Sequence, residues 1–290
     1  MSRTARANLM LLLAAVLWGG GFVAGKMALT GAAPFVILTW RFMISALVTF
    51  LLFARRIRRT PKRTALSGAA VGAIQMTALA VQLTGLQYTT SAKQSFLCTA
   101  YVAMTPFVSW LLLKKRPGIP AVLGGGLALL GIGLISLERD LSVNIGDGMS
   151  LGFAVMFALQ IVLVGKFVAQ ETDSIQLTFF QFLSAAALAL LICLLRGETL
   201  AVRGTEALMG LAYIAIPNTC IAFLLQNAAQ KDTKDVVASL IMSLESVFGF
   251  AFSLLYYGEA VTWRLLLGGG LCFAAILLNT VKIHPKKVEV

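Results

Sequence analysis

Glu245 is the one carboxylate that falls deep inside an apolar segment of this 290-residue chain. It lies ten residues after Asp235, about 15 Å along a helix, and so near the middle of a hydrocarbon layer of about 30 Å. A carboxylate at that depth must pair with a cation, face a water-filled cavity or stay protonated. Two interpretations are open: a group that binds a substrate amine or a coupling proton, and a structural glutamate that fixes its helix to a neighbour.

Two basic residues, Lys26 and Arg41, also fall within apolar segments. Together they could form an electropositive entry for a carboxylate. Alternatively, each could extend its aliphatic stem to the outer headgroups and leave its charge in water. We expect the second behaviour for Lys26, which lies near a helix end. Arg41 is about seven residues, roughly 10 Å, inside its helix and could pair with backbone carbonyls or a substrate anion.

Other polar and aromatic side chains of the apolar segments are candidates to line a shared cavity. Gln75 and Gln82 are seven residues apart, so they share one helix face. Any of these side chains could instead act as an interhelical hydrogen-bonding clamp. With Glu245, the full set of cavity candidates is Trp18, Gln75, Gln82, Thr99, Tyr101, Thr105, Asn218 and Gln226.

Helix-weakening residues within the segments are candidate hinges. Gly19, Gly20 and Gly21 each weaken a helix by about 1 kcal/mol relative to alanine, and Pro106 and Pro217 each remove a backbone donor. The glycines could bend during gating or could allow close helix packing, as small residues do in membrane bundles.

Residues for metal, cofactor or acid–base chemistry are scarce. The four cysteines lie in apolar segments without a CxxC pair, the sole histidine is His284 in the tail, and no GxxxxGK[ST] motif is present. We therefore expect no metal, no cofactor and no enzymatic activity.

The composition indicates a membrane protein. Apolar residues make up 59% of the chain and charged residues 12%, against roughly 25% charged residues in soluble domains. The net charge of +12 does not indicate nucleic acid binding, because the basic residues lie in short loops between apolar runs. The expected partners are the lipid bilayer and a small-molecule solute; the oligomeric state stays open.

The predicted fold is an all-α integral membrane protein with ten transmembrane helices. The apolar segments run over 8–29, 34–54, 65–86, 92–113, 119–137, 147–168, 174–195, 205–229, 235–257 and 262–281. With the N-terminus inside, 17 Lys and Arg residues lie on the cytoplasmic side and 5 on the other. This excess predicts that both termini are cytoplasmic, in the inner membrane of a bacterium.

A sequence pattern recurs about 140 residues apart. Gly25-Lys26 is matched by Gly165-Lys166, Phe42 by Phe182, and the LGGG run at 123–126 by that at 267–270; Pro106 pairs with Ser246. Each copy holds five segments, an odd number, so the second must lie upside down relative to the first. We predict two inverted five-helix repeats, 1–140 and 141–290, as in many secondary transporters.

At several of these positions the chain resembles the drug/metabolite transporter superfamily, in particular its EamA-type ten-helix members. The stretches that carry the resemblance are 17–26, Arg41-Phe42, 115–117, 244–248 and Gly258-Glu259. It implies a helix bundle that moves small metabolites, often amino acids outward, through a central cavity. Many relatives have proline after the glutamate where this chain has Ser246, which puts a proline kink there in doubt.

The leading hypothesis is a secondary transporter that exports small metabolites, such as amino acids or drug-like solutes, by alternating access. Protons are a candidate coupling ion. The alternatives are a passive channel or facilitator and an intramembrane lipid-handling enzyme, which would lack its usual acid–base residues.

Overall fold

The computed structural model describes residues 2–114, 116–136, 144–170, 172–258 and 261–280, and every regular element in these ranges is a helix. In chain order they are α1 (Arg3–Leu29), α2 (Pro34–Ile57), α3 (Lys62–Gly85), α4 (Ser91–Cys98), α5 (Tyr101–Leu113), α6 (Ile119–Ser136), α7 (Ile145–Ala169), α8 (Ser174–Leu195), α9 (Thr205–Tyr213), the π-helix η1 (Ile214–Ile221), α10 (Ala222–Ala229), α11 (Asp235–Met242), α12 (Glu245–Tyr257) and α13 (Trp263–Thr280).

By length and composition, eight helical segments of the described chain can cross a membrane. They are α1, α2, α3, α4 with α5, α7, α8, α9 through α10, and α11 with α12. Helices α6 and α13 contain shorter apolar stretches, Val122–Gly131 and Trp263–Ala275. The chain is therefore a multi-pass, all-helical membrane protein, as the composition predicted.

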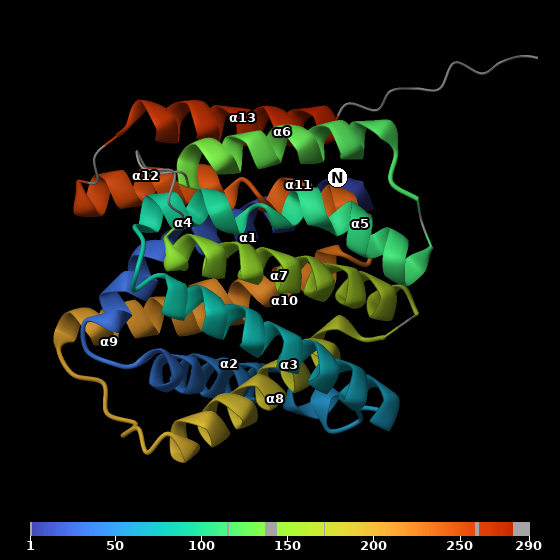
Figure 1. Cartoon of the computed structure of the whole chain (residues 1–290). Coiled ribbons are helices and arrows are strands. Elements are labelled where there is room, and N and C mark those ends of the chain that lie inside the picture. The colour runs from blue at the N-terminus through green and yellow to red at the C-terminus, as the bar shows by residue number, and fades with distance from the viewer. Residues whose placement is uncertain (1, 115, 137–143, 171, 259–260, 281–290) are drawn as a thin grey trace, which may run out of the picture.

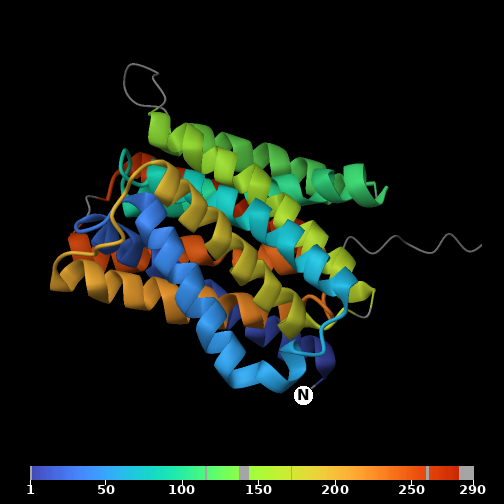
Figure 2. The same cartoon turned by 90° about the horizontal axis from the view of Figure 1, so that it is seen from below.

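Local sequence explains where several helices begin and bend. Asn144 caps α7 by accepting from the Gly146 backbone N–H at 2.8 Å, and Asp173 caps α8 by accepting from that of Ile175 at 2.9 Å. Pro34 starts α2, where a missing N–H costs nothing. Near its other end α2 bends at Phe53, whose φ of −128° and ψ of 24° are not helical (Figure 2).

The helices form a layered bundle in which α6 and α13 lie side by side along one side, and α2 and α8 lie along the other (Figure 1). Between these pairs, α1 packs against α9, α10 and α12, whereas α7 packs against α3, α4 and α5. Each half of the chain thus places its first helix among the third and fourth segments of the other half.

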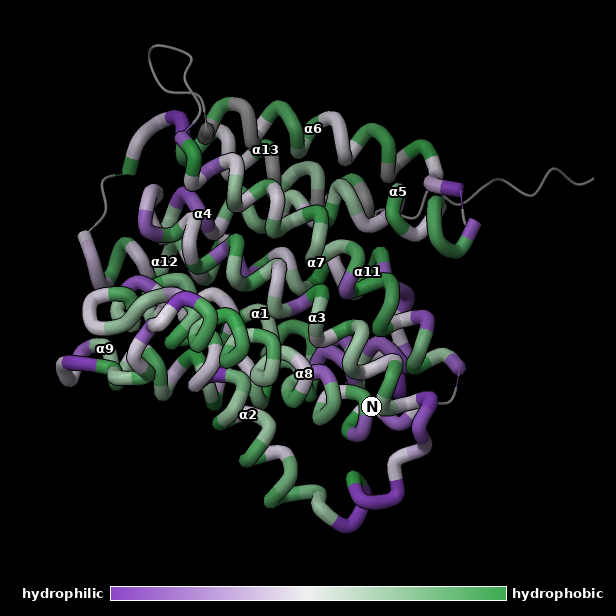
Figure 3. The backbone as a smooth tube through the Cα atoms, turned by 60° about the horizontal axis from the view of Figure 1, so that its bottom comes forward, coloured by the Kyte–Doolittle hydropathy of each residue, from purple (hydrophilic) through white to green (hydrophobic). Residues whose placement is uncertain are grey.

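One end of the bundle carries the N-terminus, the connection from α2 to α3 and the end of α5 (Figures 1 and 3). Hydrophilic residues of the Arg55–Arg63 stretch and of the α5 terminus gather there (Figure 3). Large apolar side chains along the helices are exposed on the sides instead: Leu47, in the middle of α2, is 58% exposed and Leu130, in α6, is 67% exposed. This distribution suits a protein whose sides contact lipid.

Two of the predicted spans are broken in the same place. One break lies between α4 and α5, and the other lies between α11 and α12. The first and last residues of α11 and α12 each follow those of α4 and α5 by 144 residues. At each break a hydroxyl bonds the carbonyl three residues earlier: Thr99 to Phe96 and Ser243 to Leu240, both at 2.6 Å. The predicted pairing of Pro106 with Ser246, at an offset of 140, does not match this register.

Proline does not cause these breaks. Pro106 lies inside α5, six residues past Ala100, and 235–257 contains no proline. The helix of this segment is nevertheless interrupted, at Ser243 and Leu244 between α11 and α12.

Small residues join α3 to α8. A Cβ added at Gly72 would collide with the Gln181 carbonyl and the Ser184 hydroxyl, whereas one at Gly126 on α6 would meet nothing within 4 Å. We predict that Gly72→Ala lowers the thermal unfolding temperature of the detergent-solubilised protein, by an overpacking cost of about 1–3 kcal/mol. The matched control Gly126→Ala should leave it unchanged or raise it, because alanine is the better helix former. Equal melting temperatures for both variants would contradict the packing.

Candidate functional site

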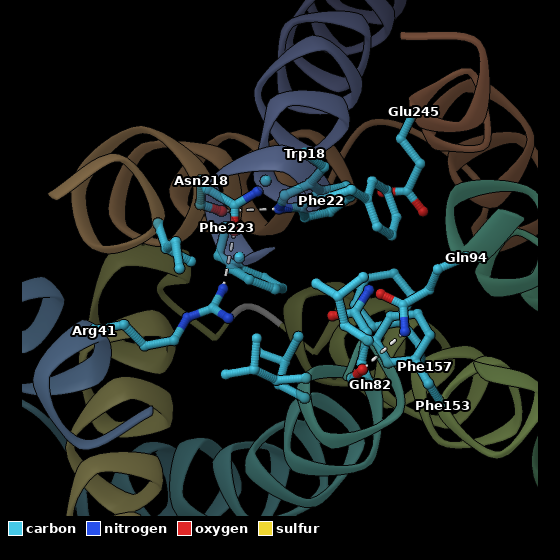
Figure 4. A pocket seen from close by; sticks show the side chains of 16 residues that line it. Trp18, Phe22, Arg41, Gln82, Gln94, Phe153, Phe157, Asn218, Phe223 and Glu245 are labelled. Carbon is cyan, nitrogen blue, oxygen red and sulfur yellow. Dashed lines mark hydrogen bonds between the residues drawn. The ribbon is translucent and has the colours of Figure 1, made fainter. Parts of the chain in front are cut away.

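A cavity lies among the central helices and encloses about 510 Å³ of space between atoms, including the part open to the surroundings (Figure 4). Several lining residues stand near the helix ends opposite the N-terminus: Gly25 is four residues before the end of α1, and Gln94 lies in the first turn of α4. The lining comprises Trp18, Gly21, Phe22, Gly25, Arg41, Leu79, Gln82, Leu83, Leu86, Gln94, Phe153, Phe157, Ile214, Asn218, Phe223 and Glu245.

Arg41 supplies the positive charge of this cavity. It comes from α2, is 4% exposed and points toward the centre of the cavity (Figure 4). Its Nε donates to Thr219 Oγ1 and its Nη2 to Asn218 Oδ1, both at 2.9 Å. Within the described part of the chain no carboxylate forms an ion pair with it. Two of its five N–H groups are thus held by neutral oxygens, which leaves others for an anion.

The partners of Arg41 are fixed by the π-helix η1. Pro217 in this element has no N–H for a regular helical bond, which suits a local widening of the helix. The widened turn is tied to α1, because Trp18 Nε1 donates to the Asn218 carbonyl at 2.9 Å and Asn218 Nδ2 donates to the Leu17 carbonyl at 3.1 Å. The Asn218 amide is therefore oriented with its oxygen toward Arg41.

Glu245 lies on another wall of the same cavity, at the start of α12 directly after the helix break (Figure 4). It is 4% exposed, and its Oε1 has no hydrogen-bond partner. The Tyr101 hydroxyl is likewise buried without a hydrogen-bond partner. Tyr101 and Glu245 are equivalent positions, since each opens the second half of a broken helix.

Gln94 joins Glu245 in this part of the lining, although the sequence analysis did not single it out. Its Nε2 donates to the Gln82 carbonyl at 2.8 Å and contacts Ser150 Oγ at 3.4 Å. Its Oε1 is buried and has no partner. The signal that could have identified it is its residue type: it is an amide in the first turn of an apolar segment, and Gln82 is an amide in the last turn of the preceding segment.

Aromatic rings close the cavity toward the end of the bundle that carries the N-terminus. The Trp18 ring lies 5.1 Å from that of Phe223 and 5.5 Å from that of Phe157, and the rings of Phe182 and Phe223 are 6.3 Å apart. We call these four residues, Trp18, Phe157, Phe182 and Phe223, the aromatic floor. The sequence analysis missed its three phenylalanines as site residues because phenylalanine is common throughout apolar segments.

Five of the nine cavity candidates do not line the cavity. Gln75 is hydrogen bonded to Gln181, and Gln226 donates to Gln160 at 3.2 Å, so both clamp helices together. Thr99 and Thr105 bond carbonyls of their own helical segment. The Tyr101 ring is fully buried, with its centroid 5.0 Å from that of Phe157. The structure thus brings Trp18, Gln82, Asn218 and Glu245 together with Arg41.

Lys26 is not part of the lining; its Nζ lies 5.2 Å from the centroid of the Tyr257 ring.

The three glycines of α1 lie in an uninterrupted helix and face three different neighbours. A Cβ at Gly19 would meet Phe248 Cβ at 2.5 Å, one at Gly20 would meet the Tyr213 hydroxyl, and one at Gly21 would meet the Asn218 amide. Close packing therefore accounts for them. Their role as hinges, like that of Pro106 and Pro217, stays a prediction.

No cluster of His, Cys, Asp and Glu that could hold a metal ion occurs among the described residues, and Cys98, Cys193 and Cys220 are free thiols.

Known proteins resemble this chain over most of its length. The sequence profile described as the EamA-like transporter family matches residues 5–137 and 144–281. Two proteins of Archaeoglobus fulgidus, each described as an uncharacterized transporter, are similar: one is 28% identical over 277 residues, with 96% of this chain and 86% of the relative covered. The other is 24% identical over 288 residues, with 96% and 99% covered.

A crystal structure of a protein has the same fold, with a TM-score of 0.75 at 18% identity over 96% of this chain and 98% of the other. The resemblance inferred from the sequence motifs is confirmed. The chain belongs to the EamA-like transporter family, and it is a membrane transporter rather than an enzyme.

Proposed function

We propose that this transporter exports small zwitterionic solutes of the amino-acid class by alternating access. The observation that carries the proposal is the pair of charges on different walls of one cavity, Arg41 and Glu245, neither of which neutralises the other (Figure 4). A zwitterion satisfies both at once, because it brings an anion for the guanidinium and a cation for the carboxylate.

The remaining lining sets the shape of the solute. The ammonium group would lie near Glu245 and the free Gln94 oxygen, and the carboxylate near the spare N–H groups of Arg41. Phe22, Phe153, Phe157 and Phe223, which all line the cavity, would contact an apolar side chain or the body of a drug-like solute.

Alternating access requires two halves of opposite orientation, and we propose the ten-helix inverted repeat, 1–140 and 141–290, as its basis. Two features of the packing support it. Helices α1 and α7 each pack against the third and fourth segments of the other half, and α2 pairs with α8 as α6 pairs with α13. The equal lengths of the two broken spans, 8 and 13 residues in each, support it further. In this arrangement α6 and α13 also cross the membrane.

The orientation follows from charge. The basic residues gathered at the end that carries the N-terminus support our proposal that this end faces the cytoplasm, in a bacterial inner membrane. The cavity, which reaches toward the opposite end, is then the outward-facing site. Glu245, as the charged acceptor within it, is the group through which protons would couple to transport.

The experiment is solute counterflow into liposomes that contain the purified protein. Liposomes preloaded with an unlabelled apolar amino acid should take up the labelled solute transiently above equilibrium. The matching amine, which lacks the carboxylate, and the matching acid, which lacks the amino group, should compete only weakly. Ionic conductance without counterflow would identify a channel, and equal competition by all three compounds would exclude recognition of both charges.

A further inference from the structure

We infer that a layer of buried amide and hydroxyl side chains beyond the aromatic floor is the closed second half of the solute pathway. This amide layer consists of Gln75, Gln160, Thr178, Gln181, Gln226 and Asn227, all fully buried. It serves as a transit site for the solute between the cavity and the end that carries the N-terminus, and its uncharged groups would form hydrogen bonds with the passing solute. The inference rests on the proposed alternating access. It gives a role to six buried polar residues that do not line the cavity.

The position of the layer follows from helix geometry. On three helices a polar layer residue lies three or four positions from a floor residue, about 5–6 Å toward the N-terminal end of the bundle. These pairs are Phe157 with Gln160 on α7, Phe223 with Asn227 on α10, and Phe182 with Thr178 on α8. A solute that passes the floor along the bundle therefore meets the amide layer next.

Hydrogen bonds across the layer hold α10 to its neighbours. Gln226 Nε2 donates to Gln160 Oε1 on α7 at 3.2 Å. Asn227 Nδ2 donates to Thr178 Oγ1 and Gln181 Oε1 on α8, both at 2.8 Å. Interhelical bonds of this kind average only about 0.6 kcal/mol in membrane proteins, so the seams between α10, α7 and α8 can open.

Unpaired atoms distinguish the layer from a simple clamp. Four of its polar atoms are buried without a partner: Gln75 Nε2, Gln160 Nε2, Gln226 Oε1 and Asn227 Oδ1. Each such atom costs free energy here and gains a partner if water or solute enters. No charged side chain belongs to the layer, so a zwitterion would meet hydrogen-bonding groups without a charge to trap it. These are the properties of a transit site that is closed in this conformation.

The opposite seam, between α3 and α8, is built to stay closed. Gly68 and Gly72 bring α3 against the backbone of α8, where an added Cβ at Gly68 would lie 2.7 Å from the Leu177 carbonyl oxygen. Ser184 Oγ of α8 also donates to the Ala69 carbonyl at 3.1 Å. We therefore place the opening at α10 and use the α3–α8 seam as the control.

The test is a reversible crosslink across each seam in a variant whose native cysteines are replaced by serine or alanine. Oxidation of the pair Thr178→Cys and Asn227→Cys should reduce counterflow to the level of empty liposomes, and reduction should restore it. The control pair, Ala69→Cys and Ser184→Cys, should crosslink and leave counterflow unchanged. Undiminished counterflow with the Thr178–Asn227 crosslink formed would overturn the inference.

A second readout does not depend on solute movement. Gln226→Cys should react with a membrane-impermeant maleimide from the side that carries the N-terminus and should be protected once Thr178→Cys and Asn227→Cys are crosslinked. If it never reacts from either side, the layer is a permanent clamp, even in an active transporter. If labelling responds to the crosslink while no amino acid moves, the layer opens as inferred and the proposed solute class is wrong.

Discussion

Arg41→Gln should reduce counterflow of a zwitterionic amino acid by about 100-fold. The substitution removes the positive charge and leaves Asn218 and Thr219 without a charged donor inside the bundle. Loss of one partner of a buried, hydrogen-bonded charge pair costs about 2–5 kcal/mol, and about 3 kcal/mol corresponds to roughly 100-fold. Initial counterflow rates at equal protein content measure this effect.

Two further variants make the Arg41 result specific. Arg41→Lys keeps the charge but cannot offer the guanidinium fork to both Asn218 and Thr219, so an intermediate rate is expected. Arg196→Gln changes a side chain that is 59% exposed at the end of α8, and it should behave as the wild type. If Arg41→Gln, shown to be folded by size-exclusion chromatography, transports at the wild-type rate, the guanidinium does not bind the solute.

Glu245→Gln should lower counterflow by at least about tenfold and should also remove its dependence on pH. The amide preserves the size of the side chain but cannot carry the charge that attracts an ammonium group or release a proton. A contribution of about 1.4 kcal/mol from the charge already accounts for tenfold. Counterflow rates measured across a pH series for both proteins give the comparison.

The control for this prediction is Glu206→Gln, which alters an exposed carboxylate in the first turn of α9 and should leave rate and pH profile unchanged. A purely structural Glu245 would give a different pattern. The Gln variant would then unfold at a lower temperature while its remaining transport kept the wild-type pH profile, and that outcome would contradict the coupling role.

Helix positions were predictable because a membrane imposes one requirement on every span, a long apolar run bounded by loop residues. The predicted segment 174–195 is α8 to the residue, and 34–54 differs from α2 by three residues at one end. The breaks at Thr99 and Ser243 could not be predicted in this way, because both halves of each broken span are apolar and the hydropathy does not change at the break.

The side-chain partners were harder to predict than the helices. Gln75 and Gln82 do share α3, yet Gln75 meets Gln181 on α8, whereas Gln82 lines the cavity. Spacing along one helix gives the direction of a side chain, but the neighbour that it meets depends on how the other helices pack. Arg41 and Asn218 were both candidates, but their hydrogen bond joins α2 to η1, two elements 177 residues apart in the chain, and spacing along the sequence does not predict it.

The most direct test of alternating access is the two-sided labelling of a single cavity cysteine. Gln82→Cys in the cysteine-free variant should react with a membrane-impermeant thiol reagent from the outer face of vesicles. In vesicles of opposite orientation, it should also react from the other face while amino acid counterflow proceeds. Throughout, the membrane should show no ionic conductance. Reaction from one face alone during active counterflow, or reaction from both faces with a continuous conductance, would contradict a cavity that opens to the two sides in turn.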